Sequence, residues 1–97
     1  MCIRDSSEIN IAVTKIDYVF NTAGVMAVPT FQTTKEGIEL QFGSNHLGHF
    51  LLTNLIMPKI LAAGNGSRII NVSSTGFEIN GVNFEDPNFQ VCDQLRC

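Results

Sequence analysis

Two short runs rich in β-branched and aromatic residues, with a long apolar stretch between them, most constrain what this chain can fold into. The runs are Ile16–Phe20 and Arg68–Ser73. Residues of this kind favour strands that are buried between two helical layers. Two such strands joined by a long helix are expected to pair in parallel through a right-handed crossover. The sequence therefore predicts an α/β fold built on one βαβ unit.

The helix of this unit is expected to be long and to begin with a shorter segment. A helical pattern starts near Thr33 or Thr34, and either residue could cap the first turn. Glycines within the pattern predict a short helix that leads into a longer one over residues 44–63. Gly64 and Gly66 predict the end of that helix.

Another helix is expected before the first strand. Ile9, Ala12 and Val13 recur at intervals of three to four residues, which is typical of an amphipathic helix. Residues 7–14 therefore read as the tail of such a helix. Beyond Gly76 the chain is polar and irregular, and a long surface loop is predicted there.

Composition narrows the classes of partner. Six Lys and Arg stand against nine Asp and Glu, for a net charge of -3, and no basic stripe exists that could bind nucleic acid. The apolar run Leu47–Ala63 is interrupted by polar residues and Pro58, which indicates a buried helix and no membrane span.

No signal peptide is recognisable, and Cys2, Cys92 and Cys97 form no C-x-x-C pair. Reduced thiols and a cytoplasmic location are expected.

Polar motifs follow both predicted strands. Asn21-Thr22-Ala23-Gly24 comes directly after the first strand, and Ser73-Ser74 closes the second. Ligands of open parallel sheets bind outside the carboxyl ends of the strands, so both motifs are expected at the binding edge. Ala23 and Gly24 are small enough to let a bound nucleoside approach the backbone. Taken alone, the first motif could equally be an ordinary turn and the second a hydroxyl that caps a loop.

A third motif, Asn45-His46-Leu47-Gly48-His49-Phe50, lies near the start of the long helix. His46 and His49 stand one helical turn apart, as two metal ligands could, but zinc needs further ligands and no matching residue is near in the sequence. No metal site is predicted, and the two imidazoles are expected to pack or to face a neighbouring subunit. Asn45 taken alone could be a polar helix cap.

In this order the three motifs resemble the middle of the short-chain dehydrogenase/reductase family. Gly37-Ile38-Glu39, the motif that begins at Asn45, and Met57-Pro58 resemble the branch that contains retinol dehydrogenases. The resemblance implies a partial Rossmann-type doubly wound parallel sheet, with residues 7–97 as a fragment of an NAD(P)-binding domain. The family usually has a second Asn where Thr22 stands. Residues 1–6 are similar to a translated sequencing adapter and are interpreted as a non-native leader. The alternative is an ordinary polar N-terminus.

The resemblance also implies a reaction, in which hydride passes between the nicotinamide of NAD or NADP and a lipophilic alcohol or carbonyl substrate. Ser74 matches the catalytic serine, which hydrogen-bonds the substrate carbonyl. Asn45 matches the asparagine whose backbone carbonyl holds a water in a proton relay. Asn21, Ala23 and Gly24 match the cofactor-binding turn.

Two parts of that machinery are not found in the sequence. No Gly-rich phosphate turn occurs, and the single tyrosine, Tyr18, lies inside the first strand and begins no Y-x-x-x-K pair. The resemblance places the reacting tyrosine soon after Cys97. The 97-residue chain alone is therefore expected to be poorly folded and inactive, and the full-length protein to be an oxidoreductase that could form homo-oligomers. The alternative is a non-catalytic βαβ module that binds a nucleotide or a partner.

Overall fold

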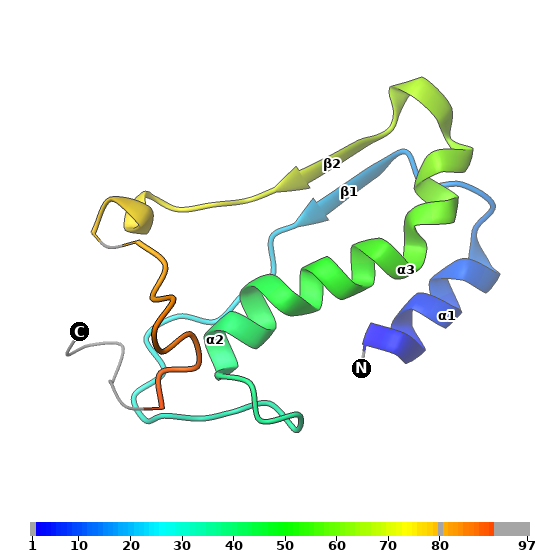
Figure 1. The fold of residues 1–97 in the computed structure, drawn as a ribbon. Coiled ribbons are helices and arrows are strands. Elements are labelled where there is room, and N and C mark those ends of the chain that lie inside the picture. Colours follow the sequence, from blue (N-terminus) through cyan, green and yellow to red (C-terminus); the bar gives the residue numbers. More distant parts are fainter. Residues whose placement is uncertain (1, 80, 91–97) are drawn as a thin grey trace.

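A computed structural model describes residues 2–79 and 81–90, and predictions for Cys92 and Cys97 lie outside them. Helices and strands follow in the order α1 (Cys2–Ala12), β1 (Tyr18–Asn21), α2 (Leu40–Phe42), α3 (Gly48–Ala62) and β2 (Arg68–Asn71) (Figure 1). Three further turns complete the described chain. They are the π-helical turn η1 (Gly43–Leu47) between α2 and α3, and the 3₁₀ turns η2 (Gly64–Gly66) and η3 (Thr75–Glu78).

The two strands form a parallel pair, with Tyr18 opposite Arg68 and Asn21 opposite Asn71. In Figure 1 both arrowheads point toward the end of the molecule where α2 begins, and α3 runs beside the strands. The predicted α/β fold, a βαβ unit of a partial Rossmann-type sheet, is confirmed. β1 begins at Tyr18 and not at Ile16, because the backbone N–H of Ile16 donates to Lys59 of α3 (2.9 Å).

The predicted start of the long helix near Thr33 or Thr34 is wrong. The helix begins at Leu40 and is capped by Glu39, whose carboxylate accepts hydrogen bonds from the backbone N–H groups that follow it. Thr33 instead pairs with Glu39 in an antiparallel bridge. The chain reverses between them at Gly37, whose φ of 81° lies in the left-handed region that glycine adopts readily.

The end of α3 agrees with the prediction. Ala63 forms the C-cap, and Gly64 follows with a φ of 80°, as is usual for a glycine that ends a helix. Pro58 lies inside α3 and removes one helical donor. Figure 1 shows a bend in this C-terminal part of the helix, which is the expected effect of the proline.

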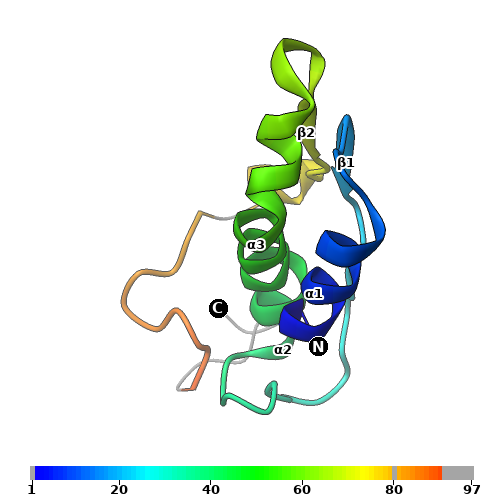
Figure 2. The same cartoon turned by 90° about the vertical axis from the view of Figure 1, so that its right-hand side faces the viewer.

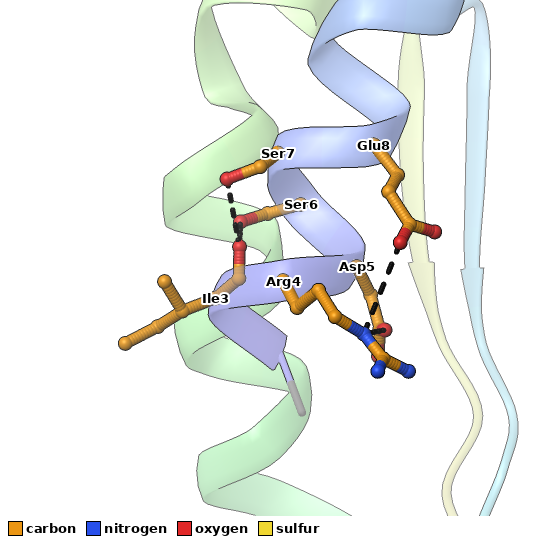
Figure 3. Close-up of polar contacts among 6 residues, drawn as sticks. All are labelled: Ile3, Arg4, Asp5, Ser6, Ser7 and Glu8. Carbon is orange, nitrogen blue, oxygen red and sulfur yellow. Dashed lines mark hydrogen bonds and ion pairs between the residues drawn. The ribbon is translucent and has the colours of Figure 1, made fainter.

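Helix α1 begins at Cys2, earlier than the predicted residue 7, and packs beside α3 (Figure 2). The side chain of Asn10 donates to the carbonyl of Leu55 in α3 (3.0 Å). In the first turns of α1, both Ser6 and Ser7 donate to the carbonyl of Ile3 (Figure 3). The interpretation of residues 1–6 as a leader stays a prediction.

The described residues bury little apolar surface. Ile56 and Ile60 of α3 are the buried hydrophobic side chains among them, whereas Phe20 on β1 and Phe50 on α3 are 66% and 63% exposed. The radius of gyration is 15.7 Å, compared with about 12.5 Å for a compact domain of this length. In the described ranges, no helix is both long and apolar enough to cross a membrane. The βαβ unit therefore presents apolar faces that further structure would have to cover.

Candidate functional site

The side chain of Asn21, the last residue of β1, connects both strands to the long helix. Its Nδ2 donates to Oδ1 of Asn71 on β2 (2.8 Å) and to Oγ1 of Thr53 on α3 (3.2 Å). Asn21 and Thr53 are both buried, so the bond between them is shielded from water, and the two bonds together fix the spacing of the three elements. The carboxyl ends of the strands are thereby held against the middle of α3.

Asn45 holds the loop that follows β1. Its Oδ1 accepts from the backbone N–H of Val25 (2.8 Å), and its Nδ2 donates to the carbonyl of Val25 (2.8 Å). A primary amide that bonds both groups of one residue acts like a neighbouring strand. The side chain is therefore no helix cap, which was the alternative for Asn45 taken alone, and the cap is Glu39.

The backbone around Asn45 forms the π-helical turn Gly43–Leu47. Within this turn the N–H of Gly48 donates to the carbonyl of Gly43, a wider spacing than in an α-helix. Single π turns inside helices are rare and are often found at functional sites, because they displace backbone carbonyls from the regular ladder. Asn45 lies in this turn together with Ser44 and His46.

A hollow of about 650 Å³ lies between α3 and the carboxyl ends of the strands. Its polar lining consists of Asn21, Asn45, His46, His49, Thr53, Asn54, Asn71 and Ser73, and its apolar lining of Phe50, Met57, Ile69 and Val72. The structure thus brings together two of the predicted site residues, Asn21 and Asn45, with the strand end that precedes Ser74. Amide and hydroxyl groups dominate the polar part, so the hollow offers hydrogen bonds to a neutral polar group.

Ser74 lies just beyond this hollow and is exposed. Its Oγ accepts a hydrogen bond from the N–H of Gly76 (3.1 Å) and so caps η3. This contact matches the loop-cap alternative. It uses a lone pair of the hydroxyl and leaves the hydroxyl proton for another partner, so the predicted role as a donor to a substrate stays a prediction.

The predicted cofactor residues have different surroundings. The side chain of Asn21 is directed inward and is committed to Thr53 and Asn71. Ala23 and Gly24 are exposed at the carboxyl edge of β1. The backbone of Ala23 and Gly24 is therefore accessible to a cofactor. Cofactor contact stays a prediction for Asn21, Ala23 and Gly24.

The two histidines are packed differently from one another. The ring of His46 stacks on Phe42, with centroids 5.6 Å apart, while His49 is half-buried in the wall of the hollow. Across residues 2–79 and 81–90, no three His, Cys, Asp or Glu side chains gather as metal ligands would. The stack of His46 on Phe42 fits the expectation that this ring packs, and contact of either imidazole with a neighbouring subunit stays a prediction.

Sequence reasoning assigned no role to Thr53 or Asn71 at this edge, and it missed Glu39 as the helix cap. Thr53 is buried in the middle of an apolar helix, where a threonine carries no distinguishing pattern. A signal did exist for Asn71, because it ends β2 at the position that pairs with Asn21. Equivalent ends of adjacent parallel strands meet at one edge.

Comparison with known proteins agrees with the geometry. The short chain dehydrogenase family model matches residues 3–84. Retinol dehydrogenase 13 of Homo sapiens is 50% identical over 77 residues, which are 79% of this chain and 23% of that protein. Retinol dehydrogenase 14 of Mus musculus is 47% identical over 74 residues, which are 76% of this chain and 22% of that protein.

A solved structure of an uncharacterised protein from Mycobacterium paratuberculosis has the same fold, with a TM-score of 0.75 and 35% identity. The likeness covers 94% of this chain and 32% of that one. This chain spans less than a quarter of the length of the two retinol dehydrogenases named above. The chain belongs to the short-chain dehydrogenase family, in which it is similar to the retinol dehydrogenases.

Proposed function

We propose that this chain is the central βαβ unit of an NAD(P)-dependent oxidoreductase that interconverts a lipophilic alcohol and its carbonyl. Family membership supports the class of reaction. The names of two relatives specify retinol, which supports a lipophilic substrate. The observation that carries the proposal is the shared edge, where the loops after β1 and β2 lie beside the π turn that contains Asn45.

The loop after β1 suits the nucleoside end of a dinucleotide. Asn45 holds Val25 by two hydrogen bonds, and a Cβ at Gly24 would lie 2.8 Å from Oδ1 of Asn45. The loop can lie this close to the helix only because residue 24 has no side chain. Ala23 and Gly24 would hold the cofactor through their backbone, and the nicotinamide, when bound, supplies or accepts hydride.

Ser74 would hydrogen-bond the substrate oxygen. A serine hydroxyl without a paired base cannot abstract a proton at neutral pH, so its contribution is to stabilise negative charge that develops on that oxygen. The backbone carbonyl of Asn45 would hold a water that relays the proton. The acid or base itself is expected from a tyrosine and a lysine in the full-length protein.

The test is hydride transfer by the purified full-length protein. NADH and NADPH labelled with deuterium at C4 are each incubated with retinal and with acetaldehyde. We expect deuterium on the hydroxyl-bearing carbon of the retinol formed, which was the carbonyl carbon of retinal. We also expect one cofactor to be preferred and acetaldehyde to be a poor substrate. Cofactor binding without any transfer by the folded protein would favour the alternative, a non-catalytic nucleotide-binding module. The cytoplasmic location and the formation of homo-oligomers stay predictions.

A further inference from the structure

The segment that follows Ser74 returns to the start of the long helix, where the side chain of Asn88 bonds to it. Its Oδ1 accepts from the backbone N–H of Glu39 (2.5 Å), and its Nδ2 donates to the carbonyl of Gly37 (3.0 Å). The two contacts link parts of the chain that are far apart in sequence. We call Asn88, Gly37 and Glu39 the Asn88 clasp.

The chemistry of the clasp requires an amide. The N–H of Glu39 can only donate and the carbonyl of Gly37 can only accept, so the partner must offer one group of each kind at a fixed spacing. Asn88 does so, and the orientation of its amide is set by these two partners. The side chain therefore adds to the edge of the 33–39 turn as a short strand would.

Glu39 connects the clasp to the reaction site. Only 4% of this residue is exposed, and its carboxylate accepts from the N–H groups of Gln41 (2.9 Å) and Phe42 (2.7 Å). Its backbone also pairs with Thr33. The residue that receives Asn88 is thus the one that starts the helix on which Asn45 lies.

The loop that carries Asn88 has a defined conformation. Asn83 accepts from the N–H groups of Glu85 (3.2 Å) and Asp86 (3.1 Å), and Asp86 accepts from the N–H of Gln90 (2.9 Å). Phe89, next to Asn88, has a φ of 49°, which is unfavourable for a bulky residue and persists where surrounding contacts fix the backbone. The clasp is one such contact.

We infer that Asn88 is a positioning residue for the proposed oxidoreductase reaction. By fastening the segment that follows Ser74 to Glu39, it fixes the position of that segment relative to Asn45 on the helix. Asn88 acts through Glu39 and the backbone and is assigned no contact with substrate. The inference rests on the proposed function, which expects the reacting tyrosine and lysine beyond this segment.

The experiment uses the full-length protein and three variants. Asn88→Ala removes both hydrogen bonds, Asn88→Gln keeps both amide groups on a longer side chain, and Asn65→Ala is the matched control. Asn65 is an exposed asparagine in η2, away from the clasp. For each protein we measure kcat, the KM for the cofactor, the thermal midpoint and the hydrogen exchange of the Glu39 amide.

In Asn88→Ala we expect kcat to fall about 10-fold to 100-fold, the range expected when reacting groups are displaced by a fraction of an ångström to an ångström. The KM for the cofactor stays unchanged, because the Ala23–Gly24 loop is held by Asn45. The Glu39 amide exchanges about fivefold faster, as expected for loss of one hydrogen bond. Asn88→Gln recovers part of kcat, and Asn65→Ala equals the wild type.

A purely structural role predicts a lower thermal midpoint with kcat unchanged below it, and that result would overturn the inference. So would an unchanged exchange rate at Glu39, because the clasp would then be absent. If the folded wild-type protein transfers no hydride, the proposed function fails and the inference fails with it. An active wild type with an equally active Asn88→Ala variant overturns the inference alone.

Discussion

Gly24 and Asn45 lie so close together that no side chain fits between them. A Cβ at position 24 would be 2.8 Å from Oδ1 and 3.1 Å from Cγ of Asn45. Oδ1 already accepts a hydrogen bond from the N–H of Val25, so it cannot move aside without breaking that bond. The glycine of the loop after β1 is therefore explained by the asparagine of the helix, and neither residue can be interpreted alone.

Replacement of Gly24 by alanine should displace the loop from Asn45. In the full-length protein we expect the free energy of unfolding to fall by about 1–3 kcal/mol, as is usual for overpacking, and the KM for the cofactor to rise. Gly66→Ala is the control, since a Cβ there meets no atom within 4 Å. Denaturant titration and cofactor kinetics measure both effects, and a Gly24→Ala protein as stable as Gly66→Ala would contradict the close contact.

The side chains of Asn21 and Thr53 should be energetically coupled through the hydrogen bond between them. Thr53→Val leaves one Nδ2 proton of Asn21 buried without its acceptor, at a cost of about 1–3 kcal/mol. A double-mutant cycle with Asn21→Ala should return a coupling energy of about 0.5–3 kcal/mol. Additive effects would mean that the bond contributes nothing measurable. Thr75→Val, at an exposed threonine, should change stability by less than about 0.5 kcal/mol.

Loss of the helix cap should destabilise the start of the long helix. Glu39→Ala removes the acceptors for Gln41 and Phe42, and we expect a cost of about 0.5–2 kcal/mol in the free energy of unfolding. Glu39→Gln should recover part of it, because one amide oxygen can still accept. Glu85→Ala, at an exposed glutamate, is the comparison. Equal denaturation midpoints for Glu39→Ala and Glu85→Ala would show that the Glu39 carboxylate does not stabilise the start of the helix.

The helix start shows why part of the fold could not be predicted. The βαβ unit and its glycine-terminated helix follow from local patterns of apolar residues and from Gly64, and these predictions were confirmed. Thr33 and Thr34 carry a local cap signal too, but the turn at Gly37 and the pairing of Thr33 with Glu39 override it. Partners distant in sequence leave no local signal.

The candidate site also has features that local sequence patterns predict and features that they do not. Strand ends predict that Asn21 and Ser73 lie at one edge, and both line the hollow. The bonds of Asn21 to Thr53 and Asn71 join three separate elements, which no single stretch of sequence encodes. The roles proposed for Asn45 and Ser74 in a reaction rest on family resemblance, and the geometry adds the π turn and the cap on η3.

The proposed function requires that Ser74 take part in the reaction and not merely cap η3. The most direct measurement compares kcat of the full-length protein with that of Ser74→Ala and Ser74→Asp. An aspartate can keep the cap on η3, but its ionised carboxylate cannot donate a hydrogen bond to a substrate carbonyl. We predict that kcat falls by about 10²- to 10³-fold in both variants, the usual effect of removing one such donor, and is unchanged in Thr75→Ala. A wild-type kcat in Ser74→Asp would show that the serine is only a cap and would contradict the claim.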